Sequence, residues 1–103
     1  MAELLSGTKD IPSAGTAVQI KNVSRKVLYL HLHARTGNTN NVWFGDSTVA
    51  ANLGKPIAAN GTFTIEPGQY RDVSGQSHAV PFSSFYVDAD TNGNDVEWVA
   101  LVL

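Results

Sequence analysis

The sequence predicts an all-β protein, a single-domain antiparallel β-sandwich of six to eight short strands with jelly-roll or Ig-like topology. Apolar and polar residues alternate with a period of two in several segments, whereas no window of about 11–18 residues keeps a helical period. Turn residues separate these segments at intervals of about 8–12 residues, which is typical of sandwiches and barrels. Charged residues make up 16% of the chain, below the ~25% of average soluble domains. Ser, Thr, Asn and Gly take their place, a composition of β-structure and of surfaces that meet other proteins.

The length indicates one domain. A chain of 103 residues sustains one core and removes roughly 65% of its unfolded surface on folding. We expect the sandwich to span residues 15–103. Residues 1–14 lack a clear period and contain Gly7 and Pro12, so we interpret them as an N-terminal arm, loosely ordered or ordered only against a neighbour. A short first strand at residues 3–5 is the alternative.

Two alternating strands are predicted next. Residues 16–21 alternate, with Val18 and Ile20 on the buried side. Residues 26–35 form the longest strand candidate. Its core face carries Leu28, Leu30, Leu32 and Ala34, and its opposite face carries Val27, Tyr29, His31 and His33. Such large amphipathic side chains indicate that another chain, a loop or the arm covers this opposite face.

A central segment, residues 41–65, is predicted to run as strand, structured excursion, turn and strand. Val42-Trp43-Phe44 suits a half-buried strand. Pro56 restricts its neighbours to a strand start or a sheet edge, because proline has no N–H to donate. Asn60-Gly61 predicts a two-residue turn, and Phe63 and Ile65 then share one face of the next strand.

The central segment also carries Gly45-Asp46-Ser47-x-Val49, followed by Gly54-x-Pro56-Ile57 and a turn into an alternating strand. In this order it resembles a small β-sandwich domain of tailed-bacteriophage virion proteins. The matching residues are Val42, Trp43, Phe44, Gly45, Asp46, Ser47, Val49, Gly54, Pro56, Ile57, Gly61, Phe63 and Ile65. The resemblance implies a structural virion part, such as a capsid decoration or fibre-associated protein, and it carries no catalytic residues.

The C-terminal part is predicted to hold two more strands. Residues 70–84 show little pattern, apart from a possible edge element at residues 79–82, and residues 84–89 form a strand. Residues 95–103 then alternate Val96, Trp98, Ala100 and Val102 with Glu97, Val99, Leu101 and Leu103. Because both faces are apolar, this last strand is either central in the sandwich or capped by a partner.

Composition excludes several classes of function. The chain has no cysteine, which excludes disulfides and thiolate metal sites. A net charge of −2 does not provide the positive charge that binding to nucleic acid or to an anionic membrane requires. The first residues lack the basic and apolar regions of a secretory signal, and no segment reaches the ~18 apolar residues of a membrane span. We therefore expect a soluble protein made in a cytoplasm.

Two motifs contain metal-ligand types. His31-x-His33 puts two imidazoles on one strand face, and His78 could add a third ligand. Histidines packed beside Tyr29 explain the same pattern, so we expect no metal or other cofactor. A pH-sensitive interface is a separate possibility, because histidine titrates near neutrality.

The second motif, Asp88-x-Asp90-x-Asn92-Gly93, copies the first half of a calcium loop. The twelfth position is Val99, which cannot supply the bidentate carboxylate of such a loop. A hairpin needs Asp, Asn and Gly for its backbone angles in any case, so we interpret the motif as a turn.

No motif indicates an enzyme. The chain has no Gly-x-Ser-x-Gly and no glycine-rich phosphate loop, and its nine acids have no distinguishing setting. Carbohydrate stacking is the competing idea, and it requires Trp43 or Trp98 to be exposed on a flat face.

The sequence therefore favours a bacteriophage capsid decoration or cement protein that binds across capsid subunits and stabilises the head. Its expected partner is the major capsid protein or another virion protein, its expected location is the capsid surface, and self-association as a trimer is favoured by the resemblance. A carbohydrate-binding or fibre-attachment module on the virion is the alternative. The expected contact residues are Leu4, Leu5, Ile11, Tyr29, His31, His33, Asp46, Pro56, Leu101 and Leu103.

Overall fold

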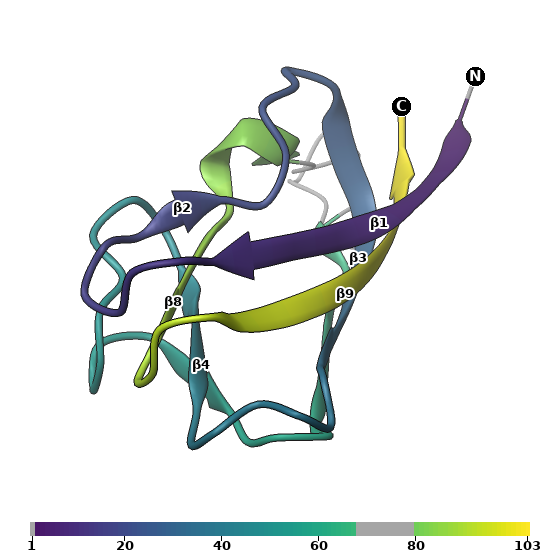
Figure 1. The fold of residues 1–103 in the computed structure, drawn as a ribbon. Coiled ribbons are helices and arrows are strands. Elements are labelled where there is room, and N and C mark those ends of the chain that lie inside the picture. Colours follow the sequence, from purple (N-terminus) through teal and green to yellow (C-terminus); the bar gives the residue numbers. More distant parts are fainter. Residues whose placement is uncertain (1, 68–79) are drawn as a thin grey trace.

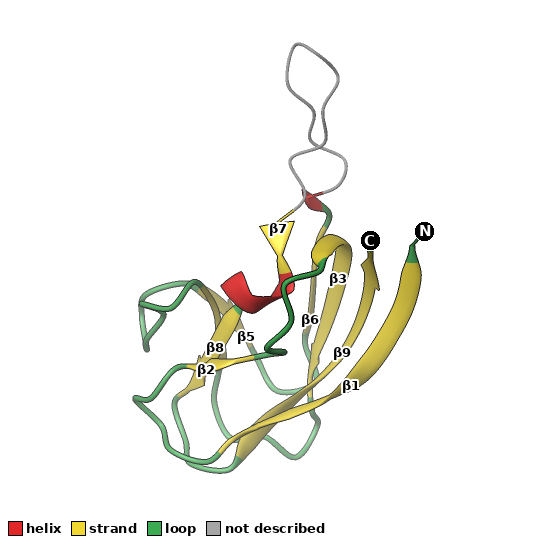
Figure 2. Cartoon of the chain, turned by 90° about the horizontal axis from the view of Figure 1, so that it is seen from above, coloured by secondary structure: helices red, strands yellow, loops and turns green. Residues whose placement is uncertain are grey.

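A computed structural model describes residues 2–67 and 80–103 of the chain, and these residues form two antiparallel sheets packed face to face (Figures 1 and 2). The all-β sandwich predicted from the sequence is confirmed. The strands are β1 (Glu3–Ile11), β2 (Val18–Gln19), β3 (Lys26–Ala34), β4 (Val42–Gly45), β5 (Lys55–Ile57), β6 (Thr62–Ile65), β7 (Val80–Pro81), β8 (Tyr86–Ala89) and β9 (Asn94–Val102). A 3-10 turn, η2 (Phe82–Ser84), precedes β8. In the described ranges, no helix has the length and apolar character needed to cross a bilayer.

The strand order identifies the topology. The five-stranded sheet runs β1-β9-β3-β6, with β7 also pairing β3, and the four-stranded sheet runs β2-β8-β4-β5. The pairs β1·β9, β2·β8, β3·β6 and β4·β5 are nested along the chain, and all are antiparallel. Eight strands in two sheets with this nesting form a jelly roll. Of the two topologies left open by the sequence, the jelly roll is therefore the observed one.

The core lies between the two sheets, and contacts between aromatic rings hold it together. Phe44 of β4 contacts Phe63 and Phe85, with both centroid distances at 5.6 Å. Phe82 lies edge-on to Trp98, with centroids 5.1 Å apart. The Phe44–Phe63 contact joins the two sheets, because Phe44 of β4 belongs to the four-stranded sheet and Phe63 of β6 to the five-stranded one. Such offset and edge-on pairs stabilise a core beyond the apolar area they bury.

The N-terminal segment differs from the expected arm. Glu3–Ile11 is a strand that pairs with β9 along all nine of its residues, from Glu3 opposite Val102 to Ile11 opposite Asn94. The alternative of a first strand was right, and this strand runs well past residue 5. The sequence hides it because its inward positions include Gly7 and Lys9 instead of a regular apolar series.

The long strand β3 follows its predicted alternation only from Tyr29 onward. Leu30, Leu32 and Ala34 are fully buried, as expected. The pairing with β9 shifts register between Val27 and Tyr29. This bulge turns Val27 into the core, where it is fully buried, and leaves Leu28 only partly buried. The predicted faces are therefore wrong for these two residues.

The other predicted strands are present with adjusted bounds. The strand expected at residues 16–21 shortens to β2, although Ile20 is buried and its N–H donates to the Phe85 carbonyl. A turn is present one residue earlier than predicted: the Gly61 N–H donates to the Ala58 carbonyl, so Ala59 and Asn60 are central, with Asn60 at a φ of +63°. It connects β5 to β6 of the other sheet and closes no hairpin. β9 lies between β1 and β3, so the expectation of a central last strand is confirmed. Of the segment 70–84, which shows little pattern in the sequence, residues 70–79 lie outside the described residues.

Candidate protein-binding face

The outer face of the five-stranded sheet brings together side chains from four strands. Cross-strand pairing sets them in three rows: Leu4, Leu101 and Tyr29; then Ser6, Val99, His31 and Thr64; then Thr8, Glu97, His33 and Thr62. We call these eleven residues the outer face. Side chains on one side of a strand repeat every second residue, and the pairing of β1 with β9 brings residues far apart in the sequence, such as Leu4 and Leu101, together here. No other element of the described chain is stacked on this face in Figure 2.

One end of the outer face is apolar and exposed. Leu4 is 67% exposed and Val99 is 37% exposed. Four large hydrophobic side chains are exposed in the described residues. Three of them, Leu4, Val99 and the adjacent Leu103 (48%), lie at this end. Exposed apolar side chains that cluster in this way mark interaction surfaces, whereas scattered ones need no explanation.

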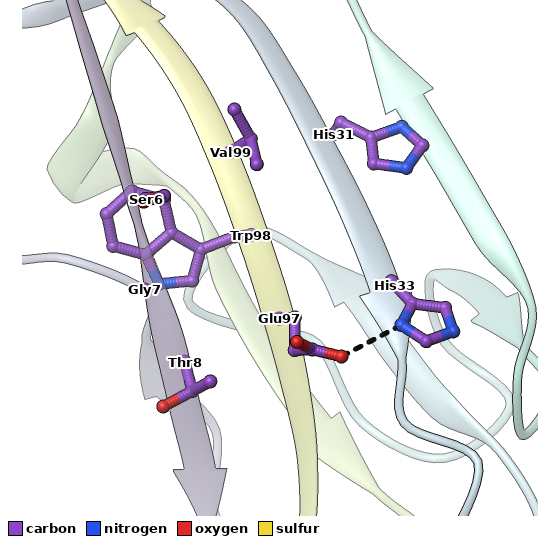
Figure 3. Close-up of a pocket in the computed structure, with 8 residues that line it drawn as sticks. All are labelled: Ser6, Gly7, Thr8, His31, His33, Glu97, Trp98 and Val99. Atoms are coloured by element: carbon purple, nitrogen blue, oxygen red, sulfur yellow. Dashed lines mark hydrogen bonds and ion pairs between the residues drawn. The ribbon is translucent and has the colours of Figure 1, made fainter.

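The other end is polar and is organised around His33 (Figure 3). Its Nδ1 lies 3.1 Å from Glu97 Oε1, and its Nε2 lies 3.0 Å from Asn60 Oδ1. Because both ring nitrogens face oxygen acceptors, the hydrogen bonds to Asn60 and then Glu97 raise the pKa of His33 above its usual value. Protonated histidine donates from both nitrogens, so this arrangement favours the charged form.

His31 has a different environment from His33. Its Nδ1 lies 2.8 Å from Thr64 Oγ1 on β6. Both histidines line an open depression of about 380 Å³ together with Glu97, Trp98 and Val99 (Figure 3). In the part of the chain that the structure describes, no group of three or more His, Asp or Glu side chains is arranged to hold a metal ion. His78, the third ligand considered from the sequence, lies outside the described residues.

The remaining expected contact residues do not belong to this face. Ile11 is fully buried in the core, so its expected role as a contact is wrong. Leu5 points inward and is partly buried against the core. Asp46 and Pro56 are exposed, but Asp46 belongs to the excursion between β4 and β5, and Pro56 belongs to β5 at the edge of the other sheet. There Asp46 accepts hydrogen bonds from the Thr48 hydroxyl and backbone N–H, which lower the pKa of its carboxyl.

The loop at residues 88–93 uses its oxygens within the protein. Asp88 is buried, and its Oδ1 accepts the backbone N–H groups of Gly15 at 3.0 Å and Ala89 at 2.7 Å. Asp90 Oδ1 accepts the Trp43 indole N–H at 2.9 Å. Asn92 Oδ1 accepts the Ala14 N–H at 2.7 Å. The three oxygen-bearing residues therefore fasten neighbouring loops and strands, which supports the interpretation as a turn.

Neither tryptophan provides a stacking platform for a sugar. Trp43 is 8% exposed and Trp98 is 5% exposed. The exposed aromatic face that carbohydrate stacking requires is therefore lacking at both positions.

Sequence reasoning missed the residues that complete the outer face. Ser6, Thr8, Thr62, Thr64, Glu97 and Val99 were not expected as contacts. Their alternation with inward residues was visible for β6 and β9, but only the cross-strand register places them beside Tyr29 and the histidines. Pairing the first strand with the last, as a jelly roll requires, would have revealed them.

No protein-family model matches the chain, and no curated protein is similar to it in sequence. Among solved structures, the chain is similar to a Bacillus protein described under the words "Bacillus endospore appendages form a novel family of disulfide-linked pili". The similarity has a TM-score of 0.53 at 15% identity, and it covers 99% of this chain and 84% of the other. It shows a shared fold. The disulfides named there have no counterpart here, because this chain has no cysteine.

Proposed function

We propose that this protein is a structural subunit whose outer face binds another protein, and that it decorates and cements a bacteriophage capsid. The observation that supports this proposal is the row of Leu4, Leu101 and Tyr29, with Val99 beside it. This row lies on a sheet face that the described chain leaves uncovered. A rigid jelly roll holds these side chains in place without ordering a loop, which keeps the entropic cost of binding low.

The capsid is proposed because the central segment resembles phage virion proteins in Gly45-Asp46-Ser47-x-Val49 and the following Gly54-x-Pro56-Ile57. A cement protein needs no reaction. It bridges neighbouring capsid subunits, and many weak copies act together through a high effective concentration.

A second candidate is a filament subunit. The similarity in fold to the Bacillus appendage protein favours it. A filament of this chain would have to be held by non-covalent contacts alone, since no cysteine is present.

The test uses capsids purified without this protein. Added protein is expected to sediment with the capsids and to raise the temperature at which they release their contents. Val99→Glu and Leu4→Glu are expected to weaken binding, because each puts a charge into an apolar contact. Self-assembly into filaments without capsids would favour the second candidate.

Leu53→Glu is the matched control, since Leu53 is 57% exposed on the excursion, away from the outer face. We expect this variant to bind as the unchanged protein does. If Leu53→Glu abolished binding while Val99→Glu left it intact, the outer face would not be the binding surface.

A further inference from the structure

The edges of the two sheets differ in how well they are protected. In the described chain, β2 and β5 form the edges of one sheet and β1 and β6 those of the other. β2 has two residues, β5 has three and contains Pro56, and β6 has four. β1 has nine residues, contains no proline, and pairs only with β9. A long, unpaired edge presents a row of free N–H and C=O groups that can take up another strand.

A groove runs along this edge. It has a volume of about 660 Å³ and is lined by residues 6–9 of β1 and residues 17–22 around β2. Figure 1 shows the ribbons of β1 and β2 running next to each other. Tyr86 and Trp98 also line it. The groove therefore lies where the edges of the two sheets face each other, and it borders the outer face at Ser6 and Thr8.

Trp98 leaves a hydrogen-bond donor unused at this groove. Its side chain is almost fully buried, and its Nε1 is shielded from solvent without a partner among the described residues. The ring lies against Gly7 of β1, where an added Cβ would be 3.4 Å from Nε1. A buried donor without an acceptor is unfavourable, and because Nε1 is closed off from solvent, an acceptor in the groove reaches it only when the ring or β1 shifts.

The charge of the groove is opposite to that of the protein. Lys9 and Lys21 line it, and none of its twelve lining residues is an acid. The whole chain carries nine acids and a net charge of −2. No ion pair among the described residues involves either lysine. The groove is thus a basic site on an acidic protein, and it complements a negatively charged partner.

We propose that this groove binds an extended acidic segment of another protein, which adds to the free edge of β1 as a further strand. The backbone of the segment pairs with β1, its carboxylates lie near Lys9 and Lys21, and Trp98 lies close enough to the bound segment for its indole signal to respond. This site is independent of the proposed function, because it uses none of the exposed apolar side chains of the outer face.

The test uses the full-length chain labelled with ¹⁵N and a blocked peptide of alternating valine and glutamate, as long as β1. A peptide of alternating valine and lysine is the control. The acidic peptide is expected to shift the Trp98 indole N–H signal and to slow amide exchange in residues 4–9, whereas the basic peptide does neither. Trp98→Phe identifies the indole signal.

Charge reversal provides the second arm. The double variant Lys9→Glu, Lys21→Glu is expected to bind the acidic peptide about tenfold more weakly. Lys26→Glu, Lys55→Glu changes the net charge equally at two exposed lysines outside the groove, and it is expected to bind normally. The proposal is overturned if both peptides bind alike, if the Trp98 and β1 signals do not move, or if the two double variants bind equally. Val99→Glu leaves peptide binding intact, which separates this site from the outer face.

Discussion

Trp98 packs its indole ring against the backbone of Gly7 on the neighbouring strand. The two residues are directly opposite in the pairing of β1 with β9, and a Cβ at Gly7 would lie 2.9 Å from Trp98 Cζ2. The absence of a side chain at Gly7 thus makes room for the largest side chain of the core, which in turn contacts Phe82.

Gly7→Ala is expected to destabilise the protein by about 1–3 kcal/mol, because the added methyl overpacks a ring that the core holds in place. The free energy of unfolding in urea measures this. Gly37→Ala is the matched control, since nothing lies within 4 Å of an added Cβ at Gly37. Equal stability of the two variants would show that the Trp98 ring moves away freely.

Glu97→Gln is expected to lower the pKa of His33. The hydrogen bond and the negative charge of Glu97 both favour the protonated imidazole, and the variant removes the charge. NMR titration of the histidine ring signals measures the shift. Glu66→Gln, at the far end of the sheet, is expected to leave the titration unchanged. A titration curve that Glu97→Gln does not alter would mean that Asn60 alone sets this pKa.

The stability provided by His33 is expected to decrease as the pH rises. Its pKa is raised in the folded protein above the unfolded value of about 6.5. The contribution is therefore fully present below about pH 6.5 and is lost as the pH passes through the raised folded pKa. The difference in unfolding free energy between the unchanged protein and His33→Gln should be larger at about pH 5.5 than at about pH 8.5. A difference that grew with pH would contradict the assignment.

Asp88→Ala is expected to cost about 1–3 kcal/mol, because it leaves the buried N–H of Ala89 and the N–H of the exposed Gly15 without their acceptor. Asp88→Asn keeps an oxygen at this position and should cost less. Thermal unfolding compares the two variants. If they were equally stable, the acceptor would not be what Asp88 contributes.

Calcium is expected to leave the melting temperature unchanged. The oxygens of Asp88, Asp90 and Asn92 already accept protein N–H groups, so a calcium ion would have to displace these bonds. Thermal unfolding with millimolar calcium and then with a chelator tests this. A higher melting temperature with calcium, reversed by the chelator, would contradict it.

The sequence predicts the fold class and most strands because their apolar residues alternate. It fails at β1, whose inward positions hold Gly7 and Lys9, because the glycine leaves space for a residue 91 positions away. The sequence also predicts the wrong face for Val27. The bulge that buries Val27 arises from the pairing of β3 with β9, and no local pattern in the sequence indicates it.

The candidate site was predictable only in part. Tyr29, His31 and His33 stand out on β3, and Leu4 and Leu101 were expected as contacts as well. That these five share one face depends on the register of β1, β9 and β3, which no single segment encodes. The half calcium loop is the opposite case, a local pattern that suggests a site where the described residues have none. Its Asp88 and Asn92 oxygens, which look like metal ligands in the sequence, accept backbone hydrogen bonds instead.

The central claim is that the outer face is covered by another protein in the assembled particle. Hydroxyl-radical footprinting of the free chain and of the chain bound to the capsid proposed as its partner measures the side-chain exposure of Leu4, Tyr29 and Val99 against that of Leu53. We expect the three outer-face residues to be protected on binding and Leu53 to stay reactive. Protection of Leu53, with Leu4 and Val99 as reactive as in the free chain, would contradict the account.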